Sequence, residues 1–101
     1  MAVTLTINST KPSGVQFFPQ SSDANKALTD AINAFTKSQP GFISQTTTNP
    51  TSDTRQAAII FDTVENYANW MSARAKLPEQ VARVAYNKAN GITSTLNETI
   101  S

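Results

Sequence analysis

One stretch decides how this chain folds: Gln56-Ala-Ala-Ile-Ile-Phe-Asp-Thr-Val-Glu-Asn-Tyr-Ala-Asn-Trp-Met71. Its first part, residues 57–61, is an unbroken apolar run that contains two isoleucines and a phenylalanine. Branched and aromatic side chains suit a pleated strand, and an apolar run without polar alternation is typical of a strand covered on both faces. We therefore predict a buried strand that leads directly into a helix.

The helix that follows has clear start signals. Asp62 or Thr63 can cap it, and Glu65 follows Asp62 at the spacing of a capping box. Helical spacing then predicts a buried apolar stripe made of Val64, Tyr67, Ala68, Met71 and Ala75. Trp70 lies on the flank of this stripe, so we expect it to be partly buried, with one edge toward a groove or a partner.

Composition limits the partners, metals and cofactors that we expect for this chain. The chain fits one domain over residues 1–101, and a domain this small gains from extra burial in a dimer. The formal net charge is +1 with scattered signs, which argues against nucleic acid and membrane as partners. There is no histidine and no cysteine, and the carboxylates are spread out, so we expect no metal and no cofactor. Without signal-peptide features or a long apolar segment, we expect a cytoplasmic protein.

The other elements follow from alternation, helical spacing and turn residues. We expect strands at 3–8, 42–48 and 92–100, and helices that start at Ser21 or Ser22 and at Pro78. The apolar patch at 15–18 is either a brief extra strand or a hydrophobic plug. Glu98 shares the apolar face of the last strand, which marks a solvated strand end or an edge. The order is strand, helix, strand, strand, helix in two pieces, strand: the ferredoxin-like split βαβ plan, of class α+β with an antiparallel sheet.

Two local motifs carry a family resemblance. The turn Pro40-Gly41-Phe42, and the junction Phe61-Asp62-Thr63-Val64-Glu65-Asn66-Tyr67, are similar to those of the antibiotic biosynthesis monooxygenase family within the dimeric α+β barrel superfamily. The resemblance implies a homodimer whose two sheets pair face to face, which agrees with the apolar run at 57–61. It also implies cofactor-free oxidation of an aromatic, polyketide-type substrate in a pocket beside the second helix.

One branch of that superfamily degrades haem, and this chain resembles it only in part. Asn8 and Trp70 resemble two residues of that branch's site, but the histidine that ligates iron has no counterpart. Asn8 also shares a strand face with Thr4 and Thr6, so it points away from the helices. We therefore exclude haem oxygenation.

The candidate ligand-binding residues are Trp70, Asn8, Tyr86 and Arg74. Trp70 could stack on an aromatic ligand, Tyr86 could hold a substrate proton, and Arg74, like Arg83, could bind a carboxylate. Each has a structural alternative: interface packing for Trp70, a strand-end hydrogen bond for Asn8, partial burial for Tyr86 and solvation for the arginines. No catalytic residue is identified.

Three functions remain open. The chain is a metal-free small-molecule monooxygenase, a non-catalytic barrel that binds a small apolar or aromatic ligand, or a structural dimer with a closed pocket. In each case we expect a homodimer that forms through the sheet. A cavity beside Trp70 would separate the first two from the third, and oxygen uptake would separate the first from the second.

Overall fold

The computed structural model describes residues 2–15 and 24–100, with side chains in the second range described from residue 30 onward. Its elements are β1 (Val3–Thr10), α1 (Ala24–Lys37), β2 (Phe42–Thr51), β3 (Thr54–Phe61), α2 (Val64–Lys76), α3 (Pro78–Ala89) and β4 (Thr93–Ile100). The order is the predicted one, with the second helix in two pieces that meet at Leu77. The serines expected to cap α1 and most of the undecided patch at 15–18 lie outside the described residues.

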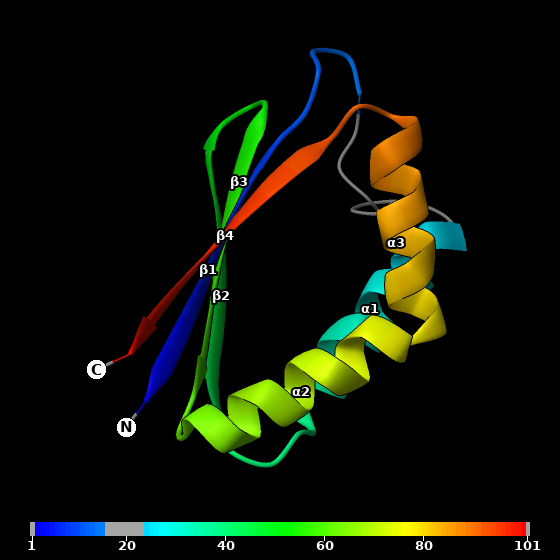
Figure 1. The fold of residues 1–101 in the computed structure, drawn as a ribbon. Coiled ribbons are helices and arrows are strands. Elements are labelled where there is room, and N and C mark those ends of the chain that lie inside the picture. The colour runs from blue at the N-terminus through cyan, green and yellow to red at the C-terminus, as the bar shows by residue number, and fades with distance from the viewer. Residues whose placement is uncertain (1, 16–23, 101) are drawn as a thin grey trace.

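The strands form one antiparallel sheet in the order β2-β3-β1-β4. All three helices lie on the same side of this sheet, and the opposite side is uncovered (Figure 1). This is the ferredoxin-like α+β fold that the sequence predicts. None of the described helices is long and apolar enough to cross a membrane.

The main core lies between α2 and one end of the sheet. It consists of Val3, Leu5, Ile59, Phe61, Tyr67 and Trp70. The register places Leu5 opposite Ile59, so alternate residues of β1 and β3 present one continuous apolar surface to α2. The ring of Phe61 stacks on that of Trp70 with centroids 5.1 Å apart. Aromatic pairs of this kind add about 0.5–1.5 kcal/mol to the stability that area burial provides.

The start of α2 is fixed by local hydrogen bonds. Thr63 is the cap, because its Oγ1 accepts from the backbone N–H of Asn66 at 3.1 Å. Asp62 instead accepts from the side-chain amide of Asn66 at 2.9 Å, and its own N–H donates to the carbonyl of Gly41. Gly41 has a φ of +83°, and a Cβ there would lie 2.2 Å from Oδ1 of Asp62. The predicted Pro-Gly turn therefore packs so closely on this junction that only glycine fits.

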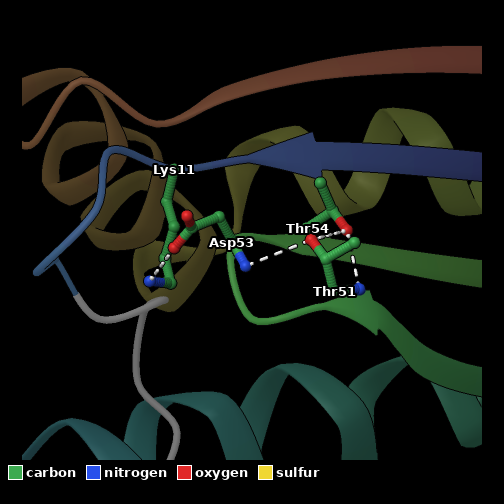
Figure 2. A network of polar contacts seen from close by, with 4 residues as sticks. All are labelled: Lys11, Thr51, Asp53 and Thr54. Carbon is green, nitrogen blue, oxygen red and sulfur yellow. Dashed lines mark hydrogen bonds and ion pairs between the residues drawn. The ribbon is translucent and has the colours of Figure 1, made fainter.

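Polar contacts tie the turn between β2 and β3 to the chain that follows β1 (Figure 2). The Nζ of Lys11 lies 3.1 Å from Oδ1 of Asp53, and the N–H of Lys11 donates to the carbonyl of Asp53. Across the turn, the N–H of Thr51 donates to Oγ1 of Thr54 at 3.1 Å. The strand β2 thus continues beyond its predicted end, because a register shift just before Thr51 accommodates Pro50 on an edge strand.

The predicted buried stripe of α2 is correct at Tyr67 and at Met71, which packs against the core, but wrong at its other members. Val64 is 47 % exposed, and Ala68 and Ala75 are exposed as well. The buried residues of α2 are Tyr67 and Trp70. The helix is rotated toward its flank because burying an indole removes far more apolar surface from water than burying a valine.

The strand at 57–61 is covered on one side only in the single chain. Ala58 and Ile60 alternate with the core residues, so they lie on the uncovered side, where both are half-buried. The last strand, β4, is an edge strand, and all eight of its residues are exposed. Glu98 lies on this edge, as predicted, and accepts a hydrogen bond from the phenol of Tyr67. Burial, and then Glu98, raise the pKa of Tyr67, so the phenol stays protonated and donates.

Candidate functional site

A cavity of about 790 Å³ lies between the helix-facing side of the sheet and the helices, at the end opposite the main core. Its apolar wall is formed by Ile7, Ala57, Val84, Ile92 and Leu96. The strands that enter it are the same β1 and β3 that carry the core, continued past Leu5 and Ile59. On this side of β3, Ala57 precedes Ile59 in the chain, and its smaller side chain leaves space beneath the helices.

Three arginines from three different elements line the cavity. Arg55 comes from β3, Arg74 from α2 and Arg83 from α3. Lys88 adds a fourth cation, and none of the described residues that line the cavity is acidic. A concave wall of one sign focuses its potential, so this cavity attracts anions.

The arginines are close enough to affect one another. Burial, then the charges of Arg74 and Arg55, lower the pKa of Arg83 to about 10. Burial also lowers the pKa of both Arg55 and Arg74. Each shift means that the charged form is less stable here than in water, which is a cost to the folded protein.

The two helical arginines are held from behind by buried side chains. The Cζ of Arg74 lies 5.4 Å from the ring centroid of Trp70, within the range of a cation–π contact. An N–H of Arg83 donates to the side-chain carbonyl of Gln80, which is itself buried. These contacts restrict the guanidinium groups without neutralising them.

On the opposite wall, α1 and β2 provide amides. The side-chain N–H of Gln45 donates to Oδ1 of Asn33 at 3.3 Å. The Oε1 of Gln45 is buried without a hydrogen-bond partner among the described residues. The cavity therefore combines an apolar wall, a cationic wall and a wall that carries amide side chains.

Trp70 does not have the accessible indole face that we expected. It is 1 % exposed and is not among the residues that line the cavity. One face of its ring stacks on Phe61, and its N–H donates to Oγ1 of Thr36 at 3.2 Å. The expectation of an exposed edge is wrong because the rotation of α2 moves this side chain into the core. Trp70 contacts Arg74 and so packs behind one residue of the cavity wall.

The other predicted site residues are scattered. Arg74 lines the cavity, whereas Asn8 and Tyr86 do not. Asn8 lies on the uncovered side of the sheet, as its position in the strand predicts, and accepts from Gln56 at 3.1 Å. The ligand-binding roles proposed for these residues stay predictions.

Arg55 and Gln80 were not identified from the sequence. Arg55 alternates with Ala57, Ile59 and Phe61, so a charged residue on the helix-facing side of β3 was a visible signal. Gln80 gave no comparable signal. Within the described part of the chain, no group of three acidic or other ligating side chains could hold a metal ion.

Comparisons with known proteins support the fold. No family model matches this sequence, and a search of curated proteins finds no match. Among solved structures, this chain is similar to SnoaB, a cofactor-independent oxygenase from Streptomyces nogalater, with a TM-score of 0.68, 15 % identity and coverage of 99 % of this chain and 92 % of that one. A candidate antibiotic biosynthesis monooxygenase from Deinococcus radiodurans gives a TM-score of 0.63 at 12 % identity, covering 97 % of this chain and 91 % of that one.

A conserved protein of unknown function from Bacteroides thetaiotaomicron, described as a possible oxidoreductase, is similar over the same extent. It has a TM-score of 0.63 and 13 % identity, and the match covers 97 % of this chain and 95 % of that one. The predicted resemblance to the antibiotic biosynthesis monooxygenases is therefore confirmed at the level of fold. At these identities, the likeness establishes the architecture and leaves the chemistry to the residues of this chain.

Proposed function

We propose that this protein oxygenates an aromatic, polyketide-type small molecule in the cavity, without a metal or organic cofactor. The observation that carries the proposal is the convergence of Arg55, Arg74 and Arg83 on one cavity without an acidic lining residue among those described. Its volume of about 790 Å³ lies within the range of small-molecule sites, about 300–1,000 Å³. The similarity to SnoaB, a cofactor-independent oxygenase, supports the same reaction class.

The chemistry needs only the substrate and dioxygen. A substrate with a methylene carbon conjugated to a carbonyl through an aromatic ring loses one proton to water and becomes an enolate. A proton returns later, when the peroxide forms. The enolate transfers an electron to dioxygen, and the carbon and oxygen then join. Loss of water gives a new carbonyl, so that R₂CH₂ and O₂ become R₂C=O and H₂O, and the substrate supplies all the electrons. Nearby guanidinium groups favour the enolate because they stabilise the negative charge on its oxygen.

We also propose that two chains pair through the uncovered side of the sheet. This side carries Ala58 and Ile60 from the central stretch, both half-buried in the single chain. Thr4 and Thr6 lie on the same side, so the interior of the resulting barrel would be partly polar. Light scattering at micromolar concentration should give the mass of a dimer, and Ile60→Lys should shift it toward the monomer. A wild-type monomer under these conditions would contradict this pairing.

Oxygen uptake tests the proposed reaction. The purified protein, dialysed against a chelator, is mixed with anthrone, whose central methylene lies opposite a carbonyl. We expect dioxygen consumption above the uncatalysed rate, and ¹⁸O from labelled dioxygen in the anthraquinone product. A rate equal to that of the blank for anthrone and for hydroxylated and carboxylated anthrones would refute the oxygenase proposal.

The non-catalytic alternative uses the same cavity. If the protein binds such aromatic molecules without oxygen uptake, it is a ligand-binding protein rather than an oxygenase. The open cavity weighs against the third possibility, a purely structural dimer with a closed pocket.

A further inference from the structure

We propose that the molecule bound in this cavity carries an oxyanion group, such as a carboxylate or sulfonate, on its aromatic body. The guanidinium groups of Arg55, Arg74 and Arg83 bind this group. The inference rests on the proposed function, because it names the substrate class of the same site.

The described lining of the cavity carries an excess of positive charge. Four cationic side chains line the cavity, and the described lining has no carboxylate to offset them. Among the described residues, neither Arg74 nor Arg83 forms an ion pair. A single enolate oxygen carries one negative charge, which does not balance the charges of Arg74, Arg83 and Lys88. A second, localised anionic group on the ligand would compensate it.

Most of the cations that line the cavity are arginines rather than lysines. The planar guanidinium group presents parallel N–H donors that match the two oxygens of a carboxylate or the oxygens of a tetrahedral anion. Three of the four cations are arginines, and they reach the cavity from β3, α2 and α3. A site built only to attract negative charge would work equally well with lysine, so three arginines favour an oriented oxyanion.

The cluster of arginines lowers the stability of the folded protein. Arg83 is buried near two other cations, and this lowers its pKa to about 10. Like charges in a partly buried site destabilise the folded protein unless a ligand compensates them. Trp70 and Gln80 contact two of these arginines, which favours the positions of their guanidinium groups beside the cavity.

The apolar wall identifies the rest of the ligand. Ile7, Ala57 and Leu96 line the cavity on the strand side. A free inorganic anion would leave this wall in contact with water, whereas an aromatic body would cover it. The flat faces of the guanidinium groups also stack on aromatic rings. The ligand therefore has an aromatic part and an anionic part.

Calorimetry on the intact protein tests this class of ligand. The probes are anthraquinone-2-carboxylate, anthraquinone-2-sulfonate and the neutral anthraquinone-2-carboxamide, which share one ring system. We expect one or both anions to bind about tenfold more tightly than the carboxamide, or better. Their ratio shows whether the site prefers a planar or a tetrahedral oxyanion. Inorganic phosphate alone should bind much more weakly than either anionic probe.

One variant removes two of the arginines, and a second variant serves as its control. Arg74→Gln combined with Arg83→Gln should reduce the preference for the anions to near parity, with circular dichroism confirming the fold. Lys76→Gln removes one positive charge from an exposed position on α2 outside the cavity, and should leave the preference unchanged.

The inference fails if the carboxamide binds as tightly as both anions, if the preference survives in the double arginine variant, or if inorganic phosphate binds as tightly as the anthraquinone anions. None of these outcomes depends on turnover. If the anionic preference is found but anthrones give no oxygen uptake, the oxygenase proposal fails and the ligand class stands. The two failures are therefore distinguishable.

Discussion

The helix-facing side of the sheet has two ends that are built from the same strands but differ in almost every physical respect. At one end, Leu5 and Phe61 are fully buried beneath α2 in an aromatic core. At the other, Ala57 and Arg55 line an open, cationic cavity. Along α2, one helical turn separates the buried Trp70 of the core from Arg74 of the cavity wall. A continuous sheet can therefore divide structural and binding roles by side-chain size and charge alone.

The packed end should respond most strongly to loss of volume. Phe61→Ala removes a fully buried ring that contacts Trp70 and Phe42, and should lower the free energy of unfolding by about 3–5 kcal/mol in urea titrations. Leu96→Ala, at the cavity end of the same sheet face, removes a side chain that is already half-exposed and should cost less than about 1 kcal/mol. Equal losses of stability at both ends would contradict the division of the sheet into a packed end and a cavity end.

The packed end should also respond to loss of its buried hydrogen bond. Thr36→Val keeps the shape of a buried side chain but leaves the N–H of Trp70 without its acceptor. We expect a loss of about 1–3 kcal/mol in the free energy of unfolding. Ser72→Ala removes a hydroxyl group at an exposed position on α2 and should alter stability by about 0.5 kcal/mol or less. A neutral Thr36→Val would mean that the indole finds another partner.

At the cavity end, replacing a side chain should raise the free energy of unfolding rather than lower it. Burial and the neighbouring arginines lower the pKa of Arg83 from its ordinary value to about 10, so the unfolded chain binds this proton more tightly. The resulting cost is fully present below about pH 10 and is lost as the pH rises toward the unfolded value. Arg83→Gln should therefore raise the free energy of unfolding at pH 7 by about 1–2 kcal/mol.

Urea titrations at pH 7 and at about pH 11 measure this effect, and the gain should be smaller at the higher pH. Lys76→Gln, exposed on α2, is the matched control and should give no gain. A loss of stability in Arg83→Gln at pH 7 would mean that its contact with Gln80 outweighs the repulsion.

The smallest change in stability is expected where the cavity is filled. Ala57→Leu adds apolar volume to the strand wall and should change the free energy of unfolding by less than about 1 kcal/mol, because the space already exists. It should nevertheless abolish binding of the anthraquinone probes in calorimetry. Ala68→Leu adds the same groups to an exposed position on α2 and should bind them normally. Undiminished binding in Ala57→Leu would place the ligand elsewhere.

The contrast between the two ends also shows what the sequence could predict. Strand alternation assigned Asn8 to the uncovered side and Glu98 to an edge, and the Pro40-Gly41 turn before β2 was predicted, because each of these depends on a few neighbouring residues. The face that α2 buries was predicted only in part, because Tyr67 is buried as expected but Trp70 takes the place expected for Val64. Helical spacing allows more than one apolar row, and the choice between them depends on the area that Trp70 buries against β3.

The cavity was harder to predict than the core. Arg55 and Arg83 are distant in the sequence, and their convergence depends on the packing of α3 over the strands. Val84 of α3 lines the cavity although its side chain is largely exposed, so burial along this helix is a poor guide to the site. One sign was visible beforehand, namely an arginine in phase with the buried residues of β3.

The contact between Trp70 and Arg74 gives this protein a built-in optical reporter. Trp70 is the only tryptophan of the chain, so its emission has a single source. Its ring is shielded from water, yet the guanidinium carbon over it belongs to a residue of the cavity wall. An anion that draws Arg74 away would change the field at the indole and shift its emission, while an aromatic chromophore in the cavity would quench it by energy transfer. Occupancy of the cavity can thus be followed in the unlabelled protein.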